Sequence, residues 1–323
     1  MKPGFCSIGI IDSCVLRCKM CYKWQEIIDH NALPAFNDWQ RTLDSLKVLR
    51  GNQDMQVIFA GGEVLQYNNI LELIRFAGER GFSTVLTSSG FLLDDMMISK
   101  LARAGLGGIT LSLDSLEMPK HDFLRGREGV FARVMRAIDL LYSRKIAVCV
   151  SAIIMESNLE EIISMAQWAL ANDKINNLLF LAPMQPNNTA EDTYWHDREE
   201  YSFLWPRDKE RACEIIEIIK EIKFSSNGRG HKILNTAPQL EAFKNYFREP
   251  DKFVKNVSCP MGQALHISSS GDIFLCYNFP SIGNIRRDLI DEAWNSPKAL
   301  EVRAGIRECR KNCHFLLNCF FGD

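Results

Sequence analysis

Cysteines are the residues of this sequence whose type and spacing could do chemistry. The chain carries 11 of them in 323 residues, with three between positions 14 and 21 and five between positions 259 and 319. In a chain without a secretion signal, cysteines at such spacings bind metal or do redox work more often than they form disulfides. The other three stand alone in apolar or amphipathic segments and are predicted to be small buried side chains: Cys6, Cys149 and Cys213.

The first cluster is Cys14-x3-Cys18-x2-Cys21, on a predicted loop after the first predicted strand. A loop lets three thiolates converge on one face of a metal cluster. Three ligands leave one iron of a [4Fe–4S] cluster open, and an open metal position can bind a substrate. Zinc and uncoordinated thiols are the alternatives. Zinc usually takes a fourth Cys or His nearby, and the first downstream histidine, His30, lies nine residues beyond Cys21.

The second cluster begins with a predicted β-hairpin. Apolar and polar residues alternate over 264–267 and 273–275 on either side of a Ser-Gly-Asp turn. A hairpin brings its two ends together, so Cys259 and Cys276 are expected side by side. The remaining cysteines follow near the C-terminus: Cys309, Cys313 and Cys319. This spacing predicts a metal-binding module that holds either zinc or an iron–sulfur cluster.

The elements that must position these residues follow an alternating pattern. Six strands are predicted, at 6–11, 55–60, 83–87, 108–113, 146–154 and 177–181. Helices are predicted between them, at 38–49, 69–79, 94–104, 130–143 and 159–171. Strands that alternate with helices predict an α/β fold with right-handed βα units and a parallel sheet. The pattern alone does not choose between a doubly wound sheet and an incomplete barrel.

The pattern changes after position 183, where a polar and aromatic segment precedes two predicted helices, at 207–223 and 238–247. We therefore predict a catalytic core over 1–205, a helical linker over 206–252 and a small cysteine-rich domain over 253–323.

Composition narrows the class of partner. The net charge is -2 and no basic stripe is present, so no nucleic acid is expected. The N-terminal apolar run is broken by Gly9 and Asp12 and is too short for a signal or a membrane span. A soluble cytoplasmic protein without a membrane partner is the expectation.

The first cysteine loop, followed by the aromatic Tyr22, resembles the signature of the radical S-adenosylmethionine (SAM) superfamily. Gly61-Gly62-Glu63, at the end of the second predicted strand, is similar to the GGE element of that family. Thr87-Ser88-Ser89-Gly90 stands where relatives commonly show T-N-G, a departure in which serine still offers a hydroxyl. Ser112-Leu113-Asp114 and Arg125-Gly126 resemble the SxD…RG segment.

The resemblance implies a partial (β/α)6 TIM-like barrel with SAM across the carboxyl ends of the strands. A [4Fe–4S] cluster would be held by Cys14, Cys18 and Cys21. The SAM contacts implied are Tyr22, Gly61, Gly62, Glu63, Ser89, Ser112, Asp114 and Arg125. In this family the open iron chelates SAM, whose reductive cleavage gives a 5′-deoxyadenosyl radical that abstracts a hydrogen atom from the substrate.

The second cluster is similar to the SPASM/twitch extension of the same superfamily. Cys259, Gly271 and Cys276 match its opening pattern, C-x9–15-G-x4-C. A full SPASM domain has seven cysteines and two clusters, whereas five cysteines are present here. The resemblance thus implies one auxiliary [4Fe–4S] cluster. Its ligands would include Cys259 and Cys276, and the choice among Cys309, Cys313 and Cys319 stays open.

The expected function is hydrogen abstraction from a peptide or from a small molecule such as a sugar. The auxiliary cluster would take up an electron or position the substrate, and an electron donor such as flavodoxin or ferredoxin is implied. The first strand begins within ten residues of the N-terminus, which favours a small molecule or a peptide presented by a partner. Polar residues considered for the substrate side are His121, Asp192, Tyr194 and His196. The rival hypothesis is a non-enzymatic iron–sulfur electron carrier or a zinc-stabilised interaction module, with closed four-ligand sites.

Overall fold

The structure, a computed structural model, describes residues 2–21, 23–25, 33–184, 194–225, 228–253, 259–313 and 317–318. Its strands are β1 (Phe5–Ile11), β2 (Gln56–Gly61), β3 (Ser83–Ser88), β4 (Gly108–Ser112), β5 (Ala147–Ile153), β6 (Asn177–Leu181), β7 (Leu265–Ile267), β8 (Asp272–Phe274) and β9 (Gly283–Asn284). Its α-helices are α1 (Phe36–Arg50), α2 (Ile70–Glu79), α3 (Asp95–Ala104), α4 (Met118–Arg125), α5 (Val130–Ser143), α6 (Ile162–Ala171), α7 (Lys209–Ser225), α8 (Ala237–Arg248), α9 (Ile290–Asn295) and α10 (Pro297–Glu308). Short 3-10 turns include η1 (Lys23–Gln25), η3 (Val64–Gln66), η4 (Glu156–Glu161) and η8 (Pro260–Gln263).

Local sequence signals set several helix ends. The Asp94 side chain accepts a hydrogen bond from the Met97 amide and so caps the start of α3. Thr236 and Ser296 cap α8 and α10 in the same way, each with a proline in the first turn. Gly105 ends α3 in the left-handed conformation, which glycine adopts without strain.

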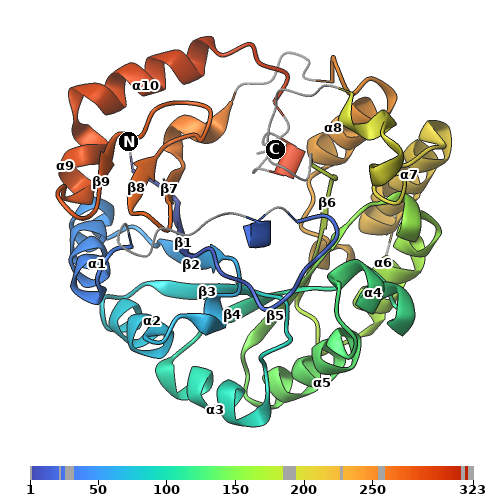
Figure 1. Cartoon of the computed structure of the whole chain (residues 1–323), viewed down its shortest axis with the longest axis horizontal. Helices are drawn as coiled ribbons and strands as arrows, with labels where there is room; N and C mark the ends of the chain where they lie inside the picture. Colours follow the sequence, from blue (N-terminus) through green and yellow to red (C-terminus); the bar gives the residue numbers. More distant parts are fainter. Residues whose placement is uncertain are drawn as a thin grey trace.

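The strands form one sheet in the order β6-β5-β4-β3-β2-β1-β7-β8-β9. All neighbours from β6 to β7 are parallel, whereas β7, β8 and β9 pair antiparallel. The sheet curves, and α1 to α6 surround its outer side (Figure 1). This is the six-stranded parallel core of a partial (β/α) barrel, so the barrel prediction is confirmed and the doubly wound alternative is set aside.

Side chains alternate along each strand between the helix layer and the barrel interior. On β1, Cys6, Ile8 and Ile10 are buried in the apolar core, while the residues between them are half-buried. The same period holds for β6, where Leu178 and Phe180 are buried. The interior positions of successive strands are therefore free to line cavities.

The C-terminal hairpin is not a separate layer but an extension of the core sheet. Strand β7 pairs with β1 in parallel, with Cys6 opposite Leu265 and Ile8 opposite Ile267. Helix α9 contacts α1, and the Ser45 hydroxyl accepts a hydrogen bond from the backbone amide of Asp291. Sequence pattern predicted the hairpin but not its attachment to β1.

Most predicted elements are present within one or two residues of their predicted ends. Helix α4 was not predicted, and the helix predicted over 159–171 is divided into η4 and α6. Within the part of the chain that the structure describes, no helix has the length and apolarity to cross a membrane.

Candidate functional site

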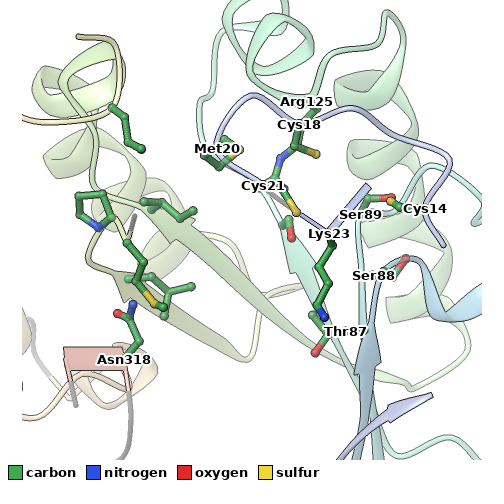
Figure 2. A pocket seen from close by; sticks show the side chains of 18 of the residues that line it. Cys14, Cys18, Met20, Cys21, Lys23, Thr87, Ser88, Ser89, Arg125 and Asn318 are labelled. Carbon is green, nitrogen blue, oxygen red and sulfur yellow. The ribbon is translucent and has the colours of Figure 1, made fainter. Parts of the chain in front are cut away.

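The cysteine cavity, of about 300 Å³, lies where the core strands reach their carboxyl ends (Figure 2). Every strand from β1 to β6 contributes to its wall directly or through the segment that follows it. Active sites of barrel folds lie at this end because the loops there are free to vary without disturbing the core. The described residues that line it are Cys14, Cys18, Met20, Cys21, Lys23, Gly61, Gly62, Thr87, Ser88, Ser89, Ser112, Arg125, Ile153, Leu181, Ala182, Pro183, Met184, Leu204 and Asn318.

The three cysteines of the first loop face this one cavity, as predicted. Burial raises the pKa of Cys14. The Leu16 amide donates a hydrogen bond to the Cys14 sulfur at 3.5 Å, which acts to lower the pKa but does not offset the effect of burial. Burial also raises the pKa of Cys18 to about 11, although Arg125 acts to lower it. Iron binds thiolates, so iron binding at these thiols must displace protons.

Glycines let the cysteine loop lie directly on its neighbours. A Cβ atom on Gly61 would come within 2.1 Å of the Ile11 carbonyl oxygen, and one on Gly62 within 2.1 Å of the Ser13 carbonyl oxygen. Gly126, on the other side, would meet the Arg17 carbonyl oxygen at 2.2 Å. The glycines of both predicted motifs are thus required for the same physical reason: their backbone lies so close to the backbone of the cysteine loop that a Cβ atom would not fit.

Glu63 lies behind the cavity rather than in its wall. Its carboxylate is fully buried and accepts hydrogen bonds from the Ser88 hydroxyl at 2.8 Å and the Ser89 amide at 3.0 Å, and from the Ser89 hydroxyl. Glu63 is not among the residues that line the cavity, and its contact with SAM stays a prediction. Glu63 instead holds the end of β3, which carries Ser88 and Ser89 into the cavity wall.

Asp114, Arg125 and Cys18 form a buried charged chain. Asp114 is fully buried and its Oδ2 lies 2.5 Å from the Arg125 guanidinium. Arg125 in turn donates a hydrogen bond to the Cys18 sulfur. Burial acts to lower the pKa of Arg125, but Asp114 and Cys18 raise it more, so the guanidinium stays charged beside the cysteine loop. Asp114 therefore supports the cavity from behind, through Arg125 and through the Ile153 amide, which donates a hydrogen bond to its Oδ1 at 3.1 Å, whereas Ser112 lines the cavity directly.

A second cation, missed by sequence reasoning, lines the cavity. Lys23 lies 3.1 Å from the Asp12 carboxylate, and Asp12 also accepts a hydrogen bond from the Ser269 hydroxyl. Ser269 belongs to the turn between β7 and β8, so the C-terminal hairpin contacts the segment that leads into the cysteine loop. No local pattern links residues this far apart in the chain.

The sequence also gave no indication of the cavity wall that lies opposite the cysteines. It is built from Leu181 to Met184 at the end of β6 and from Asn318, which Figure 2 shows across the cavity from Cys21. Both amide atoms of the Asn318 side chain bond the backbone of Ala182, at 2.9 and 3.0 Å. Asn318 thereby forms part of the cavity wall.

The second group of cysteines also comes together. Cys259 and Cys276 are close enough to interact electrostatically with each other and with both Cys309 and Cys313. Burial raises the pKa of Cys276 to about 11, and Asn278 donates a hydrogen bond to the Cys313 sulfur at 3.3 Å. Among the described residues no three Cys, His, Asp or Glu side chains converge tightly enough to bind one ion. A four-iron cluster binds one thiolate at each iron and accepts ligands that lie farther apart.

Several predicted residues lie elsewhere. Tyr22, Cys319 and Asp192 fall outside the described residues. Buried His121 accepts a hydrogen bond from the Asp114 amide, Tyr194 is 65% exposed, and His196 stacks on Trp205. None of these three lines the cysteine cavity. Cys6 and Cys213 are buried as predicted, and Cys149 is half-buried.

The chemistry of these donors fits iron–sulfur clusters. The first site offers three thiols, two cations and a roomy open side, which suits a cluster with one substrate-binding iron. The second offers four described thiols and a side-chain amide hydrogen bond to sulfur, which suits a closed cluster.

Comparison with known proteins agrees with this geometry. The family model described as the radical SAM superfamily matches residues 8–169, and that of the SPASM iron–sulfur cluster-binding domain matches residues 259–319. The AdoMet-dependent heme synthase of Methanosarcina barkeri is 24% identical over 269 residues, covering 80% of this chain and 75% of that protein. The antilisterial bacteriocin subtilosin biosynthesis protein AlbA of Bacillus subtilis is 24% identical over 303 residues, 91% of this chain and 60% of that protein. This chain therefore spans less than two thirds of the second relative's length.

The fold is also found among solved structures. Streptococcus suis SuiB bound to S-adenosylmethionine superposes with a TM-score of 0.69 at 19% identity, over 94% of this chain and 68% of that one.

Proposed function

The chain belongs to the radical SAM superfamily and carries a SPASM iron–sulfur domain, and from this premise we propose that it cleaves SAM in the cysteine cavity. As an enzyme of this family it is not the non-enzymatic carrier or zinc module that was the rival hypothesis. When bound, the [4Fe–4S] cluster supplies the electron that cleaves SAM to methionine and a 5′-deoxyadenosyl radical, which takes a hydrogen atom from the substrate.

The residues of this chain then have distinct tasks. Cys14, Cys18 and Cys21, which all line the cavity, would hold three irons of the cluster and leave the fourth without a protein ligand. Arg125 and Lys23 supply positive charge suited to the carboxylate of SAM. The remaining predicted contacts that line the cavity, Gly61, Gly62, Ser89 and Ser112, offer backbone and hydroxyl hydrogen bonds. Glu63 and Asp114 act by positioning Ser88, Ser89 and Arg125. Tyr22 stays a predicted contact.

At the auxiliary site, Cys259, Cys276, Cys309 and Cys313 are the four ligands we propose for one [4Fe–4S] cluster. Their mutual proximity supports this choice, and four thiolates leave no iron for a substrate. The cluster would then serve electron transfer rather than direct substrate binding. Cys319 stays a candidate ligand. Electron delivery from a flavodoxin or ferredoxin, and a cytoplasmic location, are further predictions.

The observation that carries the proposal is the convergence of three cysteines and two cations on one cavity at the strand ends. The test is anaerobic reconstitution followed by SAM and dithionite, with iron and 5′-deoxyadenosine measured. We expect about eight irons per chain and formation of 5′-deoxyadenosine. Cys18→Ser should abolish 5′-deoxyadenosine formation, while Cys213→Ala, a buried cysteine on α7, should leave it unchanged.

A matched variant separates the two clusters. Cys276→Ala should roughly halve the iron and leave SAM cleavage measurable, because its cluster is separate from the first. Bound iron with no SAM cleavage by the unmodified chain would rule out the proposed function. Loss of both iron and SAM cleavage in Cys276→Ala would rule out independent clusters.

A further inference from the structure

The two cations of the cysteine cavity are held in different ways. The Arg125 guanidinium contacts Asp114 at 2.5 Å and the Cys18 sulfur, and its side chain is only 10% exposed. Lys23 pairs with Asp12 at 3.1 Å, and its side chain is 29% exposed. Figure 2 shows Arg125 beside Cys18, whereas the Lys23 side chain extends into the cavity. An ammonium group has three donors, so a pair with one carboxylate leaves it able to bind a second. Of the two cations, Lys23 is therefore better suited to the carboxylate of SAM.

A lysine in an open cavity needs a partner that fixes its ammonium group. Its long side chain adopts many rotamers and loses this freedom when it binds a ligand. A partner that holds the ammonium group before the ligand arrives reduces this loss, and tighter binding follows. The Asp12 carboxylate, which is 19% exposed, lies at the right distance for this task.

Asp12 is itself fixed at both its backbone and its side chain. It directly follows β1, and a Cβ atom on Gly62 would lie 2.6 Å from its carbonyl oxygen, so its backbone packs against the end of β2. Its two carboxylate oxygens have separate partners. Oδ1 faces Lys23, and Oδ2 accepts the hydrogen bond from the Ser269 hydroxyl. Asp12 thereby connects the C-terminal hairpin to the cysteine cavity.

The turn between β7 and β8 directs one of its three serines at Asp12. The hydroxyls of Ser268 and Ser270 share a hydrogen bond at 2.8 Å, and Ser270 also donates to the Asp272 carboxylate at 2.9 Å. The Asp272 amide donates to the Ser268 hydroxyl at 3.0 Å. These two serines stabilise the turn itself, whereas buried Ser269 bonds outside it. The Ser269 hydroxyl therefore acts on Asp12 rather than on the turn.

We propose that Ser269 and Asp12 are positioning residues that hold the Lys23 ammonium group for the carboxylate of SAM. The C-terminal hairpin then acts on the first site through a single hydrogen bond, although Ser269 does not line the cysteine cavity. This inference rests on the proposed function, because it assigns the three residues to the binding of SAM.

The test measures the dissociation constant of SAM by anaerobic titration calorimetry on the reconstituted enzyme. Ser269→Ala should weaken SAM binding about fivefold, the effect of losing one hydrogen bond. Ser269→Thr keeps a hydroxyl and should restore most of the affinity. Ser270→Ala is the matched control, because it removes a hydrogen bond within the same turn but none to Asp12. It should leave the affinity for SAM unchanged. Equal weakening in Ser269→Ala and Ser270→Ala would overturn the inference, since the effect would then come from the turn as a whole.

A double-mutant cycle determines whether Ser269 acts through Lys23. Lys23→Gln alone should weaken SAM binding at least about tenfold, because a charge-assisted hydrogen bond is lost. Addition of Ser269→Ala to this variant should cause no further weakening, since the side chain that Ser269 positions is then absent. Additive effects of the two substitutions would overturn the inference, as would an unchanged affinity in Ser269→Ala.

Asp12→Asn keeps the inference testable if Ser269→Ala loads iron poorly. The amide keeps an acceptor for the Ser269 hydroxyl but loses the charge that holds Lys23, so SAM should bind more weakly. Tighter binding would overturn the inference, because Asp12 would then compete with SAM for the ammonium group.

Formation of 5′-deoxyadenosine with dithionite in the same samples separates the two proposals. In Ser269→Ala the KM for SAM should rise while kcat changes little. Normal 5′-deoxyadenosine formation with unchanged SAM binding in the variants contradicts this inference alone. Absence of 5′-deoxyadenosine from the unmodified enzyme contradicts the proposed function.

Discussion

At the residue scale, the first cluster site depends on charge that is buried and paired. Arg125 joins buried Asp114 to the Cys18 sulfur, so it pairs with a carboxylate and donates a hydrogen bond to a thiol. A buried charge in this position needs partners placed within hydrogen-bonding distance, because an unpaired buried ion is strongly disfavoured. Arginine provides several donors in a fixed plane and can satisfy both partners at once, which lysine cannot.

The substitution Arg125→Lys tests this role. It keeps the charge but loses the planar fork, so we expect SAM cleavage to fall at least about tenfold while iron content is kept. The midpoint potential of the first cluster can be measured by electron paramagnetic resonance during a redox titration. A change in this potential would separate an effect on Cys18 from a general loss of structure. The control is Arg144→Gln, which breaks an exposed ion pair with Asp95 and should change neither quantity. Unchanged SAM cleavage in Arg125→Lys would contradict the assignment.

His121 gives a pH dependence of stability. Burial, followed by the charge of Arg125, lowers its pKa from 6.5 to about 3. Between these two pKa values the unfolded chain binds a proton that the folded chain does not, so stability falls as the pH drops from 6.5 toward 3. The slope is about 1.4 kcal/mol per pH unit. The melting temperature should thus fall less between pH 6.5 and 5 in His121→Asn than in the unmodified enzyme. His231→Asn should keep the unmodified slope, and an identical slope in all three would refute the prediction.

At the element scale, the strand ends and the cysteine loop are fitted to each other through backbone contacts. Gly61 and Gly62 end β2 against Ile11 to Ser13, and Gly126 ends α4 against Arg17. The Lys19 amide also donates a hydrogen bond to the Leu124 carbonyl at 2.9 Å. The loop is therefore held from two sides before any cluster binds.

Gly62→Ala should displace the loop, because the new Cβ would lie 2.1 Å from the Ser13 carbonyl oxygen. We expect SAM cleavage to fall at least about tenfold, since small displacements of reacting groups are costly. Gly78→Ala is the matched control, because this glycine lies on the exposed side of α2 with nothing within 4 Å of an added Cβ. It should leave SAM cleavage unchanged and slightly raise the melting temperature. Equal cleavage by both variants would show that the close approach is not required.

At the scale of the whole molecule, the C-terminal part completes the core. Strand β7 covers the edge of β1, the Ser269 hydroxyl donates a hydrogen bond to Asp12, and Asn318 lines the cysteine cavity. The auxiliary domain thus contributes to the fold and to the first site as well as holding its own cysteines. The predicted boundary at 252/253 stays a prediction, and it would divide a continuous sheet.

Truncation after residue 252 tests this dependence. Removal of β7 would leave the backbone of β1 unpaired along a buried edge, and exposed edges promote aggregation. We expect the truncated chain to aggregate on size-exclusion chromatography. Cys276→Ala, which lacks an auxiliary ligand but keeps the hairpin, should elute as the unmodified enzyme does. A truncated chain of normal size that still cleaves SAM would show that the core does not need the hairpin.

Sequence reasoning alone was sufficient to predict the two groups of cysteines, the βα order and the glycine motifs, because each depends on local spacing or on a period along the chain. Only the tertiary structure decided that Glu63 and Asp114 support the cysteine cavity from behind, since a short motif does not say which way a side chain turns after its strand ends. The same holds for Lys23 and Asn318, whose positions depend on contacts between segments far apart in the chain. Such contacts arise from packing, which leaves no periodic trace in the sequence.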